Sequence, residues 1–137
     1  MRKIKIFTVG KTKESWLQEA LDEYTKRLKP HLSLEWHLAK NSDQLSTLLE
    51  KETHYICLDI KGAAFSSEEF SEWFQKTGSR LSFVIGGAEG LSEAIKAKAA
   101  LKISISPLTF THQLARLILI EQLYRALEIE KGSSYHK

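Results

Sequence analysis

The sequence predicts an α/β protein in which a mostly parallel sheet carries helices on both faces. Short runs typical of strands recur five times along the chain, and each is followed by a segment with helical spacing of apolar residues. This alternation favours parallel strands joined by crossover helices. Some of the strand runs are almost entirely apolar, as expected of strands buried on both faces. No internal repeat, linker or low-complexity stretch divides the chain, so we expect one domain over residues 1–137.

The first half of the chain supplies three of these strands and two helices. Apolar residues recur at helical spacing between Trp16 and Leu28, and Pro30 then stops the helix. From residue 32 to residue 38 apolar and polar residues alternate, a pattern typical of a half-buried strand. The elements expected here are a strand at 3–9, a helix at 16–28, a strand at 32–38, a short helix capped by Asn41 or Ser42, and a strand at 55–60.

The second half supplies two more strands and three helices. Ser66 followed three residues later by Glu69 is a capping box, which predicts the start of a helix. A glycine-rich turn with the sequence GGAEG follows the fourth strand. The elements expected here are a helix from Ser66 that ends at Gly78, a strand at 81–85, a helix from Ser92 to Ala100, a strand at 102–106, and a long helix at 112–131 that ends at Gly132.

Composition excludes several classes of protein. Twenty basic and 17 acidic residues give a net charge of +3, which permits an RNA partner without requiring one. Eight basic residues precede residue 30, although such charges are usually the solvated face of a helix. The single Cys57, in an apolar run, rules out an internal disulfide and a cysteine zinc cluster, and we expect no metal. The N-terminus lacks a signal-peptide pattern and charges interrupt the apolar segment 114–127, so we expect a cytoplasmic protein with no membrane contact.

Three loops are candidates for a ligand site. In open α/β sheets, ligands bind in the loops that follow the carboxyl ends of the strands. Residues 58–62, 85–90 and 105–110 each follow an expected buried strand and contain glycine, proline or small polar residues. The GGAEG turn is equally compatible with close approach of a ligand and with a plain tight turn. It is neither a dinucleotide-binding fingerprint nor a phosphate-binding P-loop.

The last helix is apolar around most of its circumference. A single sheet face cannot cover such a helix, so it is either enclosed within the domain or covered by a second subunit, and we favour a homodimer. Arg116 and Arg125 are either ordinary surface charges or phosphate ligands. The tail ends in Tyr135, His136 and Lys137, and on its own such a tail is more often disordered than functional.

Six motifs occur in the same order as in one known family, from Ile4 to Lys137. They are VGK near the N-terminus, LDIKG, FVIGGAEGL, LTFTHQLAR, IEQLYRA and a terminal YHK. On these motifs the chain resembles the RlmH family, ribosomal RNA large-subunit methyltransferases that modify N3 of a pseudouridine. Thr111 stands where a proline is common before the histidine of the fourth motif.

The resemblance implies a SPOUT fold whose C-terminal part forms a trefoil knot, a topology that general rules would not suggest because knots are very rare. It implies S-adenosylmethionine (S-adenosyl-L-methionine) as the methyl donor. It also implies a homodimer, in agreement with the apolar last helix. The implied substrate is 23S rRNA of the large subunit in the assembled ribosome, methylated at N3 of a pseudouridine.

The resemblance also implies the site residues. Donor-binding positions match Leu58, Gly86 and the loop residues Ile105, Ser106, Pro107, Leu108, Thr109 and Phe110. The polar group near the donor methyl matches His112, Arg116, Tyr135 and His136. From residue chemistry, we expect His136 to take the N3 proton, Arg116 to stabilise the uracil oxygens and Tyr135 to stack on the base. For Leu58 and Ile105 the alternative is a plain core position.

Three other interpretations compete with this one. A related SPOUT methyltransferase acting on tRNA keeps the fold, the donor and the dimer, and the YHK tail argues against it. A non-catalytic module on the same fold would bind RNA or a nucleotide without transferring a methyl group. A flavodoxin-like electron carrier is the third, and purified protein without flavin would exclude it.

Overall fold

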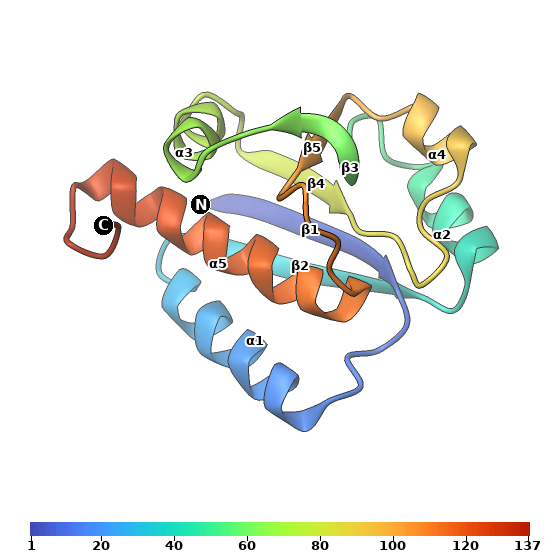
Figure 1. Cartoon of the computed structure of the whole chain (residues 1–137), viewed down its shortest axis with the longest axis horizontal. Helices are drawn as coiled ribbons and strands as arrows, with labels where there is room; N and C mark the ends of the chain where they lie inside the picture. Colours follow the sequence, from blue (N-terminus) through green and yellow to red (C-terminus); the bar gives the residue numbers. More distant parts are fainter.

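The computed structural model describes all 137 residues and contains one five-stranded sheet with five helices (Figure 1). The strand order is β2-β1-β4-β3-β5, and every pair of neighbours is parallel. The predicted α/β class is therefore confirmed. The elements are β1 (Arg2–Val9), α1 (Ser15–Leu28), β2 (Leu32–Ala39), α2 (Ser42–Leu49), β3 (Ile56–Ala64), α3 (Ser67–Gln75), β4 (Arg80–Val84), α4 (Glu93–Ala97), β5 (Leu101–Ser104) and α5 (His112–Lys131).

The two faces of the sheet carry separate hydrophobic cores. Side chains alternate along a strand, so Ile4 and Ile6 of β1 point to one face and Phe7 to the other. The first face holds the larger core, formed with α1, α3 and α5, and the second holds a smaller core with α2 and α4. Cys57 lies in the smaller core, where burial raises the pKa of its thiol to about 11, as expected of an inert cysteine.

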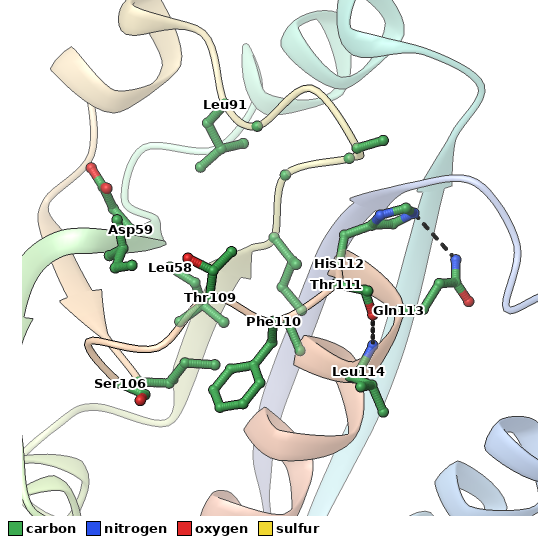
Figure 2. Close-up of a pocket in the computed structure, with 18 of the residues that line it drawn as sticks. Leu58, Asp59, Leu91, Ser106, Thr109, Phe110, Thr111, His112, Gln113 and Leu114 are labelled. Atoms are coloured by element: carbon green, nitrogen blue, oxygen red, sulfur yellow. Dashed lines mark hydrogen bonds between the residues drawn. The ribbon is translucent and has the colours of Figure 1, made fainter.

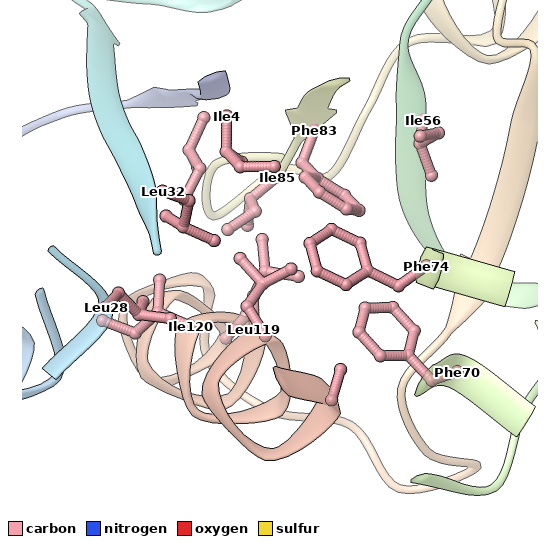
Figure 3. Packing of buried hydrophobic residues seen from close by; sticks show 14 of the residues in the cluster. Ile4, Leu28, Leu32, Ile56, Phe70, Phe74, Phe83, Ile85, Leu119 and Ile120 are labelled. Carbon is pink, nitrogen blue, oxygen red and sulfur yellow. The ribbon is translucent and has the colours of Figure 1, made fainter. Parts of the chain in front are cut away.

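Helix α5 lies in the middle of the larger core. Its contacts with α1 and α3 run along its length, and Figure 3 shows Leu119 and Ile120 between Leu28 of α1 and the rings of Phe70 and Phe74 of α3. The face directed away from the sheet is less covered. None of the helices is both long and apolar enough to span a membrane.

The helix ends follow the local signals in the sequence. The capping box of α3 is present: the Glu69 amide donates to Ser66 Oγ at 3.0 Å, and the Ser66 amide donates to Glu69 Oε1 at 2.9 Å. At the start of α5, the Leu114 amide donates to Thr111 Oγ1 at 3.1 Å. Thr111 therefore caps the helix, and α5 begins at His112 as predicted. Gly132 ends it in the left-handed region.

Strand β3 differs most from the prediction. It does not end at Ile60 but continues to Ala64, and its pairing with β5 shifts register between Leu58 and Ala63. Gly62 allows this path, because a Cβ there would lie 2.5 Å from the backbone carbonyl carbon and oxygen of Lys102. The other differences are small: α4 ends at Ala97, and β5 ends at Ser104, which leaves residues 105 and 106 in the following loop. The trefoil knot stays a prediction.

The crossing at Gly62 gives a stability prediction. Gly62→Ala should lower the free energy of unfolding by about 1–3 kcal/mol, because the added methyl group has only backbone atoms to displace. Gly78→Ala is the matched control, since a Cβ there meets nothing within 4 Å. Urea unfolding of both variants measures the difference. Equal stabilities would show that β3 and β5 do not approach each other this closely.

Candidate functional site

The principal cavity lies at the carboxyl edge of the sheet and has a volume of about 940 Å³ (Figure 2). The three segments proposed from the sequence meet there, joined by the first residues of α1 and α5. Residues 58–62, predicted to be a loop, belong to strand β3. Half of its 24 lining residues are hydrophobic, which suits a small organic ligand. The predicted donor-binding residues on its wall are Leu58, Gly86, Ile105, Ser106, Leu108, Thr109 and Phe110; Pro107 is in the same loop but is not a lining residue.

The glycine turn after β4 forms one wall of the cavity. A Cβ on Gly86 would lie 2.7 Å from the carbonyl carbon of Gly90, and one on Gly87 would lie 3.1 Å from Val9 Cβ. The Gly90 amide closes the turn on the Gly87 carbonyl at 2.9 Å. GGAEG is therefore a tight turn whose glycines line the cavity, and close approach of a ligand to this backbone stays a prediction.

The loop after β5 forms the opposite wall. Ser106 fixes its shape: the Ser104 hydroxyl donates to the Ser106 carbonyl at 3.0 Å, and the Leu108 amide donates to Ser106 Oγ at 2.9 Å. Leu108 is 70% exposed and Trp16, across the cavity at the start of α1, is 55% exposed. Exposed large apolar groups at one opening indicate a surface that a ligand or a second chain covers. The sequence prediction did not include Trp16.

Charged groups also line the cavity. Asp59 accepts from the Lys61 amide at 3.1 Å and lies 3.9 Å from the Lys96 ammonium. Its carboxylate belongs to the cavity wall, as do Glu14 and Glu89. These groups can accept hydrogen bonds from ligand hydroxyl or ammonium groups. The signal for Asp59 in the sequence was one acidic residue within an otherwise apolar strand. No group of three or more His, Cys, Asp or Glu side chains is placed to hold a metal ion.

His112, the first residue of α5, faces the cavity. His112 lines the cavity, and burial, followed by the charges of Arg116 and Lys13, lowers its pKa below 6.5. The imidazole is therefore neutral near pH 7. Its Nε2 lies 3.3 Å from Gln113 Nε2, a contact drawn in Figure 2. Gln113 also bonds to the loop between β1 and α1.

Arg116 is not on the cavity wall. Its side chain is fully enclosed, with 0% exposure. The guanidinium Nη1 donates to Thr12 Oγ1 at 3.0 Å, and Nη2 donates to the carbonyls of Val9 at 3.0 Å and Gly10 at 2.7 Å. The structure thus gives Arg116 other partners than the substrate oxygens expected from the sequence. A helical charge surrounded by apolar neighbours is normally assigned to the surface, which is why burial was not anticipated.

The two predicted tail residues dock far from the cavity. The Tyr135 hydroxyl donates to Glu121 Oε2 at 2.7 Å, and His136 Nδ1 lies 3.0 Å from Arg125 Nη1. Arg125 is 13 residues along α5 from His112, which corresponds to about 20 Å of helix. Figure 1 shows the C-terminus at the opposite end of α5 from the loop that lines the cavity. Within one chain, the four predicted catalytic residues are therefore not brought together.

Comparison with known proteins identifies close relatives. A family model described as "Predicted SPOUT methyltransferase" matches residues 2–136. The chain is 55% identical over 141 residues to the ribosomal RNA large subunit methyltransferase H of Protochlamydia amoebophila, with 100% of both chains covered. It is 45% identical to the protein of the same name from Prochlorococcus marinus, covering 98% of this chain and 96% of the relative.

Solved structures share the fold at low identity. A "probable methylase family protein" from Haemophilus influenzae superposes with a TM-score of 0.62 at 11% identity, covering 98% of this chain and 70% of that one. TrmJ from Z. mobilis superposes with a TM-score of 0.58 at 9% identity, covering 91% and 69%. These neighbours support the fold alone.

The lowered pKa of His112 gives a prediction on pH. The unfolded chain binds a proton at this histidine more readily than the folded protein, so stability should rise with pH through the window just below pH 6.5 and level off above it. His112→Asn should remove that part of the pH dependence. Urea unfolding between about pH 5 and pH 7.5 measures it. An unchanged slope in the variant would show that His112 titrates normally.

Proposed function

Because this chain belongs to the ribosomal RNA large subunit methyltransferase H family of SPOUT methyltransferases, we propose that it methylates the RNA of the large ribosomal subunit. The observation that carries the proposal is the match along the whole chain to relatives of that name, at 55% and 45% identity. The cavity supports it, since the three segments that line it are those that the resemblance assigns to the donor. We propose further that the methylated atom is N3 of a pseudouridine in 23S rRNA of the assembled ribosome.

The cavity fits S-adenosylmethionine as the donor. Its volume of about 940 Å³ is in the range of sites for ligands of this size. Gly86, Gly87 and Gly90 line one wall and carry no side chain, so a flat ring can approach the backbone there. Leu58, Leu108 and Phe110 offer apolar contacts, and the acidic wall suits a cationic group. When bound, this donor supplies an electrophilic methyl group on a sulfonium.

The chain's own residues then have to prepare the target nitrogen. N3 of a neutral pseudouridine carries a proton, which a base must accept before the nitrogen can attack. We assign that role to His136, because histidine is the side chain that most often serves as a general base. Tyr135 would stack on the base, the role its aromatic ring suggests, and His112, neutral on the cavity wall, can orient the base by a hydrogen bond.

A homodimer would bring these groups together. The tail and the cavity lie at opposite ends of α5, so a second copy packed across this helix in the reverse sense would place its tail at the first copy's cavity. Because a homodimer has a two-fold axis, each chain would then place its tail at the cavity of the other. Exposed Trp16, Leu108 and Leu114 at the cavity end of α5 supply apolar surface for such a contact. Contacts of Tyr135 with Glu121 and of His136 with Arg125 already hold the tail in place within each chain.

Methyl transfer is tested directly with labelled donor. The protein is incubated with radiolabelled S-adenosylmethionine and with intact ribosomes, free large subunits or bulk tRNA from cells lacking this gene. We expect label only in ribosomal RNA, at a pseudouridine, with intact ribosomes as the best substrate. Label in tRNA would overturn the substrate, and absence of label with donor binding intact would favour a non-catalytic module.

The shared site is tested by mixing two inactive variants. One lacks the tail after residue 133, and the other carries Leu108→Arg, an exposed position where a cation opposes a cationic donor. Each alone should be inactive. Mixed in equal amounts they should recover about a quarter of the wild-type rate, because half of the dimers are mixed and each has one complete site.

Light scattering on each variant checks that both still form dimers. A tail that acts on its own chain's cavity would give no recovery, since neither chain then holds both halves of a site. A His136→Ala variant with a normal single-turnover rate would show that the proton acceptor lies elsewhere.

A further inference from the structure

The loop between β1 and α1 is tied to the first turn of α5 by five hydrogen bonds. Three come from the Arg116 guanidinium, to the Val9 and Gly10 carbonyls and to Thr12 Oγ1. Gln113 adds two: its Nε2 donates to the Lys11 carbonyl at 3.1 Å, and its Oε1 accepts from the Lys13 amide at 3.1 Å. Partners on both sides are separated by about a hundred residues in sequence, so these bonds fix the loop relative to the cavity wall.

Arg116 is an unusual residue to find in this place. It is fully buried, it forms no ion pair with a carboxylate, and its Nε has no hydrogen-bond partner. Removing a guanidinium from water is costly, and only loop groups offset that cost here. Lysine could not replace it, because a single ammonium lacks the planar fork that reaches two carbonyls and a hydroxyl at once. The contacts are thus specific to holding this loop.

The same loop forms part of the cavity. Val9 packs against Gly87 of the glycine turn, and Glu14, which ends the loop, lines the cavity wall. A displacement of residues 10–13 would therefore move one edge of the donor site. The loop presents Lys11 and Lys13 to solvent beside this edge. Lys13 is near enough to His112 to contribute to its lowered pKa.

These two lysines differ from the other basic residues near the N-terminus. Neither Lys11 nor Lys13 forms an ion pair, whereas Lys5 lies 3.3 Å from a Glu52 carboxylate oxygen. Lys26 and Lys29 also lack ion pairs, but they lie at the far end of α1, next to the amino ends of the strands. The basic residues thus divide between the two ends of the sheet, and only the loop places free cations at the cavity.

We propose that Arg116 is a positioning residue that holds residues 10–13 as a cationic lip, on which Lys11 and Lys13 contact backbone phosphates of the RNA beside the target nucleotide. This inference rests on the proposed function. A small protein with a net charge of only +3 needs unpaired cations where the RNA enters. A loop that Arg116 already holds in place can present these cations without the entropic cost of ordering a mobile loop on binding.

The lysines are tested in the full-length chain. Lys11→Gln with Lys13→Gln should raise the KM for ribosomes about tenfold or more and lower the slope of log KM against log salt by roughly 2, with donor affinity unchanged. Lys26→Gln with Lys29→Gln is the matched control, with the same loss of charge at the other end of α1. Equal effects of the two pairs, or none from the first, would overturn the proposal.

Arg116 is tested by a double-mutant cycle with the lysine pair. Arg116→Lys keeps the charge and loses the fork, so the loop should exchange its amide hydrogens faster at residues 10–13. In that background the two lysine substitutions should have little further effect on the salt slope, because the lip is already displaced. Fully additive effects would show that Arg116 acts independently, as a direct contact with substrate would.

Two further arms keep the outcomes separate. Thr12→Val removes one of the three acceptors and serves if Arg116→Lys does not fold, and it should show a smaller loss of the same kind. Equilibrium binding to ribosomes without donor, over the same salt series, tests the lip independently of methylation. If wild-type protein binds with this salt dependence but transfers no methyl group, the proposed function fails and the lip stands. If neither lysine substitution lowers the salt dependence of binding, the proposed role of the lip is wrong and the proposed function is unaffected.

Discussion

The burial of α5 against the sheet is the interaction on which the rest of the structure depends. Leu119, Ile120 and Leu123 are almost completely removed from water, and burial of each such side chain contributes about 1.5–3 kcal/mol. The helix is thereby fixed between α1 and α3. Its first turn follows the loop that lines the cavity, and its last turn carries the tail. One packed helix therefore sets the positions of both halves of the candidate site.

Elements that depend on local periodicity were predicted correctly from the sequence. Features that depend on contacts with distant backbone were not. The capping box at Ser66 and the end of α5 at Gly132 follow from signals within a few residues. The extension of β3 through Gly62 depends on the backbone of Lys102, forty residues away, which no local pattern encodes. The three segments that line the cavity were found because a parallel sheet brings the carboxyl ends of its strands to one edge. The strand order itself has no such local signal.

The partners of the polar site residues were the least predictable part. Residue type suggested that Arg116 faces a substrate, yet its place on α5 directs it to the loop after β1. Resemblance grouped Tyr135 and His136 with His112, and within one chain about 20 Å of helix separates His136 from His112. A stiff helix cannot shorten that distance. If His136 and Tyr135 act at the cavity as we propose, they have to come from a second chain, which is an argument from geometry that is independent of the apolar surface of α5.

Charge is divided around the cavity in a way that suits two different ligands. Carboxylates of Glu14, Asp59 and Glu89 belong to its wall, where they favour a cationic donor. The free ammonium groups of the β1–α1 loop lie outside that wall, where they favour an anionic backbone. If the loop were mobile, its lysines could fold onto these carboxylates and each charge would cancel the other. The buried guanidinium of Arg116 prevents this by holding the loop by its carbonyls, so that acidic wall and cationic lip stay separate.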